Sequence, residues 1–336
     1  MSLPAGKIPI DILKEVVFKN LGAKRKEIKV GPTAGVDSAV IDVGEKSLIV
    51  SMDPITGAVE RIGWLAVNVN ANDISTFGVE PAFLFSCLML PQNADKHMVE
   101  TISTQMSQAA AELGMAIVGG HAESTPNLTH PIVVGCAIGY TPKGKYITSR
   151  GAKPKDELIL TKSAGIEGTA ILASDRETEL SAALTKAELQ NAKDFYQRIS
   201  VVKDALTAYK TGGVHAMHDP TEGGIAGGIH EMADASNLGV HLHLENITVE
   251  TETAKICNFF KIDPIQLIGS GALLIAVQPE KAADIIESLR KQKIQATVIG
   301  EFLADKSQRL VTMSNGKTKA LPRPASDHLW RALSRT

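Results

Sequence analysis

The sequence Val214-His215-Ala216-Met217-His218-Asp219-Pro220-Thr221-Glu222-Gly223-Gly224-Ile225-Ala226 carries the clearest information about the fold. Its apolar start predicts a strand at 214–217, and the Ala- and Gly-rich segment at 224–235 predicts a helix. Between them lie two carboxylates and one glycine, with no Lys or Arg. A strand that leads into a helix in this way is typical of an α/β protein.

Four other acidic segments have the same character, because each places a carboxylate beside glycines or apolar residues. They are Gly35-Val36-Asp37-Ser38, Ser51-Met52-Asp53-Pro54, Ala71-Asn72-Asp73-Ile74 and Gly119-Gly120-His121-Ala122-Glu123. An ionised carboxylate next to core-forming sequence is costly unless it is paired. Oxygen ligands beside a glycine-rich backbone suit Mg²⁺ and a polyphosphate better than they suit zinc. The sequence therefore predicts a Mg-nucleotide site.

Length and composition limit the remaining possibilities. A chain of 336 residues predicts two domains, and the Pro-, Gly- and Lys-containing segment 141–155 predicts a boundary that divides it into residues 1–150 and 151–336. Hydrophobic residues make up 44% of the chain and aromatic residues only 4%, which indicates an aliphatic core. The net charge of −2 predicts no nucleic-acid partner.

No membrane association is expected either, since the longest apolar stretches, such as Phe83–Leu90, are too short to cross a bilayer. No secretory leader is recognisable, and we expect a cytoplasmic protein. Cys87, Cys136 and Cys257 share no metal-ligand spacing, and we expect three buried free thiols.

The periodicity of apolar residues predicts alternating helices and strands. Helices are expected at 8–21, 61–77, 97–113, 165–173, within 184–210, and at 224–235 and 279–291. Strands are expected at 36–43, 47–52, 83–90, 115–118, 132–138, 157–161, 214–217, 239–244, 272–277 and 296–302. Because the alternation is imperfect, we expect mixed sheets in two α/β sandwich-like halves.

Several glycine-rich and polar segments allow two interpretations. The segment Gly31–Gly35 precedes a strand, which excludes a Walker loop; it is an ordinary turn or, beside Asp37, a loop that covers phosphates. Asn72-Asp73 in a helix is either a solvated face or a tertiary site. Thr221 is a candidate helix N-cap. Gly227-Gly228 within the next helix predicts that something approaches its backbone closely.

The histidines are mostly interpreted as structural. His215 and His218 flank an apolar residue, and His241 and His243 alternate along a strand in the manner of a half-exposed face. His121 is the exception because it belongs to the glycine-acidic segment that ends in Glu123. That segment is expected at a strand end, where open α/β sheets tend to bind ligands.

At these residues the chain resembles the superfamily that includes aminoimidazole ribonucleotide synthetase (PurM), selenophosphate synthetase, thiamine-monophosphate kinase and the hydrogenase maturation protein HypE. The resemblance covers roughly residues 30 to 305. The segments most similar to HypE are Leu65–Asn68, Asn72-Asp73, Gly78–Pro81, His215–Ala226 and Asp263-Pro264 followed by Gly271–Leu274. The combination of these segments in this order is more specific than any one of them.

This resemblance implies a two-domain PurM-like fold and a homodimer whose N-terminal sheets pair into a barrel, with ATP in a nearby cleft. It implies that Mg²⁺ is bound by Asp37, Asp53 and Asp73. The implied nucleotide-binding residues are Gly35, Asn72, Gly119, Gly120, Asp219, Thr221, Gly223 and Gly224. The implied catalytic residues are Asp73, His121 and Glu123.

The resemblance also implies a reaction, since the superfamily uses ATP to activate an oxygen or selenide by phosphoryl transfer. HypE ends in a cysteine that carries its substrate, whereas this sequence ends Leu333-Ser334-Arg335-Thr336. Where HypE has a lysine and an acidic residue, this chain has Glu123 and Ser270, and it lacks the N-terminal reactive Cys or selenocysteine of selenophosphate synthetase.

We therefore expect an ATP- and Mg²⁺-dependent, HypE-like enzyme that acts on a small or protein-borne substrate not held on its own tail, with other maturation proteins as possible partners. One alternative is a non-catalytic nucleotide-binding scaffold for hydrogenase maturation. Another is a HypE that uses a cysteine of a second protein. A selenophosphate-synthetase-like or thiamine-monophosphate-kinase-like enzyme also stays open.

Overall fold

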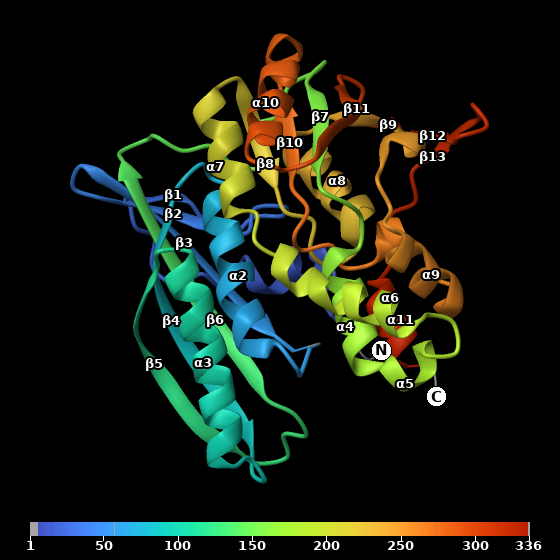
Figure 1. Cartoon of the computed structure of the whole chain (residues 1–336). Helices are drawn as coiled ribbons and strands as arrows, with labels where there is room; N and C mark the ends of the chain where they lie inside the picture. The colour runs from blue at the N-terminus through green and yellow to red at the C-terminus, as the bar shows by residue number, and fades with distance from the viewer. Residues whose placement is uncertain (1–5, 57, 335–336) are drawn as a thin grey trace.

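The computed structural model describes residues 6–56 and 58–334 and contains two mixed β-sheets (Figure 1). The first sheet has the strand order β1-β2-β3-β6-β4-β5, and only β4 and β5 run parallel. Its strands are β1 (Ile28–Val30), β2 (Ala39–Val43), β3 (Lys46–Ile55), β4 (Pro81–Pro91), β5 (Ala116–Thr125) and β6 (Ile132–Pro142).

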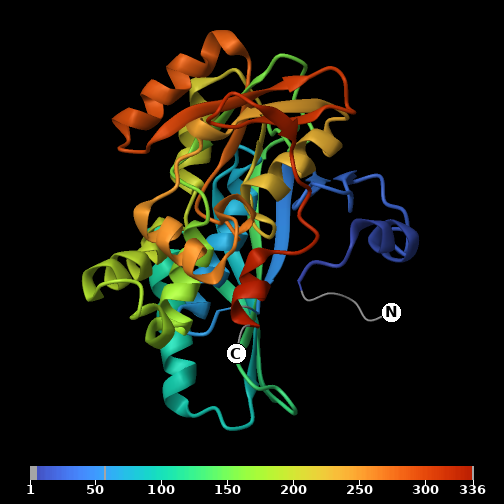
Figure 2. The same cartoon turned by 90° about the vertical axis from the view of Figure 1, so that its right-hand side faces the viewer.

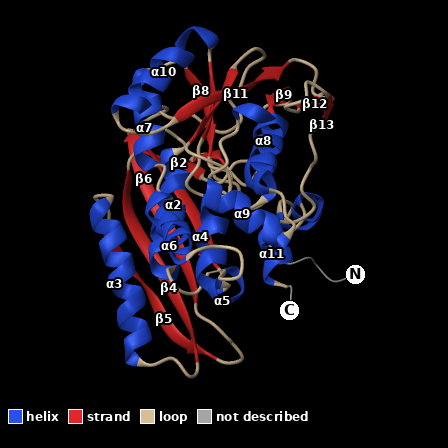
Figure 3. Cartoon of the chain, turned by 45° about the vertical axis from the view of Figure 1, so that its right-hand side comes forward, coloured by secondary structure: helices blue, strands red, loops and turns tan. Residues whose placement is uncertain are grey.

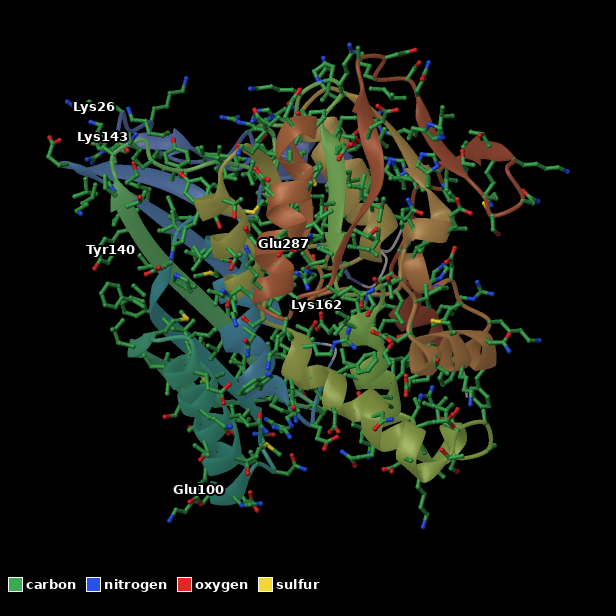
Figure 4. The ribbon with its side chains drawn as sticks, turned by 45° about the horizontal axis from the view of Figure 1, so that its top comes forward. Lys26, Glu100, Tyr140, Lys143, Lys162 and Glu287 are labelled. Atoms are coloured by element: carbon green, nitrogen blue, oxygen red, sulfur yellow. The ribbon has the colours of Figure 1, made fainter. Side chains whose placement is uncertain are left out.

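Two helices, α2 (Ile62–Ser75) and α3 (Lys96–Glu112), cover one face of the first sheet (Figure 3). Almost every residue of α2 is buried, because it packs against β3 and β6 on one side and α3 on another. The opposite face of the sheet keeps large apolar side chains exposed, among them Met52, Phe85 and Tyr140. In Figure 4, Tyr140 lies at the outer side of this sheet.

The second sheet has the order β13-β12-β9-β11-β7-β10-β8, in which only β9 and β12 run parallel. Its strands are β7 (Glu157–Thr161), β8 (Val214–His218), β9 (Gly239–His243), β10 (Leu274–Val277), β11 (Ala296–Leu303), β12 (Arg309–Thr312) and β13 (Thr318–Ala320). Helices α7 (Val202–Thr211) and α10 (Pro279–Lys291) pack together over one face.

The remaining helices lie on the other side of the second sheet or beyond its edge. They are α4 (Ile166–Asp175), α5 (Glu177–Leu180), α6 (Lys186–Lys193), α8 (Gly224–Ala235), α9 (Thr251–Phe260) and α11 (His328–Leu333). Short 3₁₀ turns occur at Asp194–Arg198, Leu244–Asn246 and Pro264–Gln266. At the N-terminus, α1 (Ile10–Ile12) continues into a π-helical turn at Leu13–Val17, and both lie apart from the sheets in Figure 2.

The predicted fold class is confirmed, since both sheets are mixed and strands of the first sheet precede those of the second. Helices α8 and α10 have the predicted bounds. The predicted strand 115–118 is too short, because β5 continues through the glycines to Thr125. Strands β1, β12 and β13 and helices α9 and α11 were not predicted. Within one chain the described strands form no closed barrel.

Two smaller predictions also need comment. Cys257 is buried, as predicted, but Cys87 and Cys136 are only half-buried, because they lie on the uncovered side of the first sheet. Among the helices of the described residues, none has the length and apolar character needed to cross a membrane.

A side chain of α2 joins the two halves of the molecule. Asn72 is fully buried, and its Nδ2 donates to the Ile199 carbonyl at 2.9 Å while its Oδ1 accepts from the Val201 N–H at 2.8 Å. The same connection is held from the second domain by Lys162, whose Nζ lies 2.7 Å from the Ser200 carbonyl and 3.0 Å from the Asp204 carboxylate. Figure 4 shows Lys162 in the interior, beside helices of both domains.

Replacing Asn72 by Ala is expected to destabilise the protein by about 2–4 kcal/mol, because it leaves two buried backbone groups unpaired at about 1–3 kcal/mol each. Urea denaturation measures this loss. The exposed Asn93, changed to Ala as a control, is expected to stay within about 0.5 kcal/mol of the wild type. Equal stability of the two variants would show that Asn72 does not hold the domains together.

Candidate active site

Four carboxylates from separate parts of the chain converge where the two domains meet. Asp37 follows the turn before β2, Asp53 lies in β3, Asp73 in α2, and Asp219 directly after β8. Burial and the charges of the other three carboxylates raise the pKa of Asp73, as expected for acids that lie close together. An oxygen of Asp37, an oxygen of Asp219 and a ring nitrogen of His218 lie within 4.8 Å of one another.

Neighbouring polar side chains fix two of these carboxylates. Asn70 binds the backbone of Asp53 on both sides, accepting from its N–H at 2.9 Å and donating to its carbonyl at 3.2 Å. Ser51 donates its hydroxyl to Oδ2 of Asp73 at 2.5 Å. Ser51 and Asp53 are two residues apart in β3, so both face the side of the sheet that α2 covers. This arrangement places the carboxylates of Asp53 and Asp73 close together.

Three oxygens of this group lack any hydrogen-bond partner among the described residues. They are Oδ1 of Asp73 and both carboxylate oxygens of Asp219, and each of the two residues is only 1% exposed. A buried polar atom without a partner is rare in native proteins and calls for a ligand or an ion to complete it. The set consists of hard oxygen donors, so it fits Mg²⁺.

Asp37 differs from the other three because basic groups reach it. His218 Nδ1 lies 3.1 Å from Asp37 Oδ2, and His218 Nε2 lies 2.8 Å from Glu231 Oε2 on α8. Lys7 Nζ is 4.0 Å from Asp37 and 3.8 Å from Glu231, with 48% of its side chain exposed, so water screens these contacts. The expectation that the acidic residues lack basic neighbours is therefore wrong for Asp37.

The environment shifts the pKa values of the group in opposite directions. Burial and the neighbouring carboxylates raise the pKa of Asp73 well above its ordinary value. Burial raises the pKa of Asp53 to about 6 and that of Asp219 to about 8. For Asp37 burial also acts upward, but His218 and Lys7 outweigh it and lower its pKa. Burial alone would lower the pKa of His218, whereas Asp37 and Glu231 raise it to about 10.

These shifts predict how the stability of the metal-free protein depends on pH. A carboxyl group whose pKa is raised by folding stabilises the folded state below its unfolded pKa, and this contribution is lost as pH rises through the folded pKa. Asp53 and Asp219 therefore lose their contributions between about pH 4 and 8, and His218 acts in the same direction above about pH 6.5. We expect the melting temperature to fall by several °C between about pH 5.5 and 8.

Mg²⁺ is expected to remove most of this fall, because a bound cation compensates the ionised carboxylates. Differential scanning fluorimetry with EDTA or MgCl₂ measures both effects, and the doubly substituted Asp53→Asn, Asp219→Asn variant serves as the control, with a smaller fall than the wild type. A metal-free melting temperature that rises over this range would contradict the assignment of these pKa shifts.

A cavity of about 850 Å³ opens at Asp37, and the other three carboxylates are not among its lining residues. The N-terminal segment, the turn at residues 31–38, helix α8 and the segment 323–327 line it. Its walls combine apolar side chains such as Ile8, Leu13 and Val36 with the carboxylate of Asp37. This volume lies within the range of about 300–1,000 Å³ that is usual for small-molecule sites.

Glycines allow the chain segments around this cavity to pack closely. Gly35 has φ +71°, and a Cβ there would lie 2.8 Å from the Glu231 carbonyl, so the turn can lie against α8 only with glycine. Gly223 and not Thr221 caps helix α8, since Gly223 is left-handed and the helix begins at Gly224. The predicted close approach to Gly227-Gly228 is made by the chain itself at Pro220 and Glu222.

Four other predicted site residues do not join the group within one chain. His121 and Glu123 lie on the exposed edge strand β5 and pair with each other, Nε2 to Oε2, at 3.2 Å. The row Asp53–Gly135–Ser86–Gly120 crosses the sheet, so Gly120 lies three strands from Asp53, about 14 Å away. His121, Glu123 and Gly119 belong to the alternate rows, which face the uncovered side of the sheet.

Two further predictions are corrected by hydrogen bonds. Asn72 was assigned to the nucleotide, but both ends of its amide bind the backbone between the domains. His218 was interpreted as structural and instead lies in the acidic group. The structural interpretation of His215 fits its contact with Asp156 at 2.9 Å. Lys7 and Glu231 were missed, because nothing in the sequence near them indicates where the chain folds.

Two family models match this chain, one for each of the two sheets. Residues 35–141 match the family model "AIR synthase related protein, N-terminal domain", and residues 153–312 match the model of the corresponding C-terminal domain. A putative hydrogenase expression/formation protein of Methanocaldococcus jannaschii is 28% identical over 306 residues, which cover 88% of each chain. Carbamoyl dehydratase HypE of Rhizobium leguminosarum is 27% identical, covering 81% of this chain and 78% of its own.

Solved structures agree on the fold. In a crystal structure of a HypE–HypF complex, the matched chain has a TM-score of 0.77 at 21% identity and covers 93% of this chain and 99% of its own. A crystal structure of HypE in complex with ATP has a TM-score of 0.73 at 22% identity and covers 98% of each chain. With the family models matching both halves, the chain belongs to the AIR synthase-related (PurM-like) family.

Proposed function

We propose that the protein is an ATP- and Mg²⁺-dependent enzyme that activates an oxygen atom of a second substrate by phosphoryl transfer. The observation that supports this most is the set of unpartnered, buried oxygens of Asp73 and Asp219, together with Asp37, which lies near Asp219 and lines a cavity of about 850 Å³. Relatives named carbamoyl dehydratase HypE and a HypE structure in complex with ATP support the same proposal.

Some residues of the site would bind the metal, and others would orient these ligands or contact the nucleotide. Asp53, Asp73 and Asp219 would hold Mg²⁺, which when bound neutralises charge on phosphate oxygens. His218 keeps Asp37 oriented, because Glu231 fixes its second nitrogen. Lys7 lies beside the cavity with a long, half-exposed side chain and can reach an anion there.

Positioning and charge neutralisation supply most of the acceleration in phosphoryl transfer, so this arrangement needs little additional covalent machinery. Isothermal titration of ATP with and without MgCl₂ tests binding, and a phosphate-release assay tests turnover. Absence of binding at millimolar nucleotide would refute the proposal.

A nucleotide-binding maturation scaffold is the second candidate. It is favoured by one observation: the predicted catalytic residues His121 and Glu123 lie away from the carboxylates within the chain. Full Mg-ATP affinity without phosphate release, in the presence of candidate partners, would support the scaffold over the enzyme. Because one structural relative was crystallised as a HypE–HypF complex, HypF is the first partner to test by co-purification.

A homodimer is also part of the proposal. The uncovered face of the first sheet exposes Met52, Phe85, Val118 and Tyr140, with exposures between 43% and 64%. Contiguous apolar surface of this kind marks an interaction site in a soluble protein. Pairing of two such faces would also bring His121 and Glu123 to the interface. Sedimentation velocity distinguishes the dimer from the monomer.

A further inference from the structure

Two histidines of the second domain lie outside the site described above. His241 and His243 alternate along β9, so their imidazoles lie on the same face of the second sheet (Figure 1). Both side chains are half-buried, whereas Val240 and Leu242 point to the other side, into the core. The half-exposed face that the sequence predicts for these histidines is therefore confirmed. Neither of them lines the cavity of about 850 Å³.

The two imidazoles are already as close as a shared ion requires. Their ring centroids lie 5.1 Å apart. Two imidazoles on one tetrahedral Zn²⁺, each with a Zn–N distance of about 2.0–2.1 Å, have ring centroids about 5 Å apart. Oγ1 of Thr312, on the neighbouring strand β12, lies 2.8 Å from Nε2 of His241. A ring that donates this hydrogen bond is oriented by it and keeps the lone pair of Nδ1 for a metal.

A carboxylate from the next strand faces the same side of the sheet. Glu301 of β11 is the partner of His241 in the strand register, and side chains directly opposite each other have Cβ atoms about 4.5–5.5 Å apart. Glu301 is exposed and has no ion pair or side-chain hydrogen bond in the part of the chain that the structure describes. Among the described residues only the group at Asp37 already has three such ligand atoms within 4.8 Å of one another, so closing this set around an ion requires a side chain to turn.

The other neighbour of Glu301 is a second acid. Glu157 of β7 lies directly opposite Glu301 in the strand register. Like charges that face each other across a sheet are destabilising. Within residues 6–56 and 58–334, no basic side chain forms an ion pair with either carboxylate. A cation beside Glu301 would relieve this repulsion, which favours a metal here independently of the two histidines.

We propose that His241, His243 and Glu301 form a binding site for a divalent transition-metal ion of the Zn²⁺ type on the outer face of the second sheet. Imidazole nitrogens with one carboxylate suit Zn²⁺ better than Mg²⁺, which prefers oxygen ligands. Three protein ligands leave the fourth tetrahedral position to water. The bound ion would join β9 to β11, and the site does not depend on the proposed ATP-dependent function.

Equilibrium dialysis of the full-length protein against micromolar ZnCl₂ counts the bound ions. The variants His243→Gln and Glu301→Gln each remove one ligand, and neither side chain has a hydrogen bond or ion pair to lose among the described residues. His97→Gln, at an exposed position on α3, is the matched control for the loss of a histidine. Because the group at Asp37 also contains a histidine and can take up Zn²⁺, Asp219→Asn is measured alongside to identify that second site. Thermal melts check the fold of each variant.

We expect the wild type to bind one Zn²⁺ ion more than His243→Gln does at the same concentration. Each ligand variant is expected to weaken Zn²⁺ binding at this site at least about tenfold, since changes even to the outer partners of metal ligands cost about 10–100-fold. His97→Gln and Asp219→Asn are expected to keep this ion. Zn²⁺ is also expected to raise the melting temperature of the wild type more than that of His243→Gln.

Equal Zn²⁺ uptake by the wild type and His243→Gln, unchanged affinity in Glu301→Gln, or the same loss in His97→Gln would overturn the proposed metal site. Failure of the protein to bind Mg-ATP would instead refute the proposed function and would leave the Zn²⁺ result unaffected.

Discussion

Replacement of Asp73 by Asn is expected to lower kcat/KM for Mg-ATP turnover by at least about 100-fold while the protein stays folded. Asp73 offers an unpartnered Oδ1 to the metal, and Asn removes the charge with little change in shape. Because burial and its neighbours already raise the pKa of Asp73, ionisation of this residue costs stability in the metal-free protein. We therefore expect the variant to melt no lower than the wild type near pH 8.

Steady-state phosphate release measures the loss of activity, and thermal melts measure the fold. Asp284→Asn, which removes a carboxylate from an exposed pair with Lys281, is the matched control and is expected to retain full activity. If Asp73→Asn instead unfolded, Asp73 would be a structural residue and the interpretation of the acidic group as a metal site would fail.

Replacement of Asp219 by Asn is expected to cost as much as the change at Asp73. From the sequence alone, Asp219 could serve only to order the loop before α8, and its replacement would then have the smaller effect. The structure removes that explanation, since neither carboxylate oxygen of Asp219 accepts a hydrogen bond from the loop or from any other described residue. We therefore expect Asp219 to act on a bound ligand together with Asp73.

Kinetics of the single and double variants distinguish the two possibilities. If both acids hold one ion, the double variant Asp73→Asn, Asp219→Asn is expected to be hardly worse than either single variant, because residues that act as a unit are strongly non-additive. Additive losses, or an Asp219→Asn variant that keeps more than about half of its activity, would show that the two residues act independently.

Much of the fold follows from local patterns. Helices α8 and α10 have clear boundaries, with glycines before the first and a proline at the start of the second. Strand β5 was predicted too short because its Gly-Gly-His-Ala-Glu segment has poor strand propensity, and only pairing with β4 extends it. Strands β12 and β13 were missed because both are short, and β13 is exposed throughout.

The candidate site was predictable to the extent that an acid beside apolar sequence is unusual. This signal selected Asp37, Asp53, Asp73 and Asp219, which the structure brings together. The same signal failed for Glu123, because an edge strand places its acids in solvent at no cost.

The amide of Asn72 has a consequence for folding. Since one side chain of α2 satisfies backbone groups at Ile199 and Val201, neither half can complete its own hydrogen bonding without the other. If the two halves were expressed separately, the amide of Asn72 would lose its partners in one half. The backbone groups of Ile199 and Val201 would lose theirs in the other. We therefore expect the two halves to unfold together in one cooperative transition.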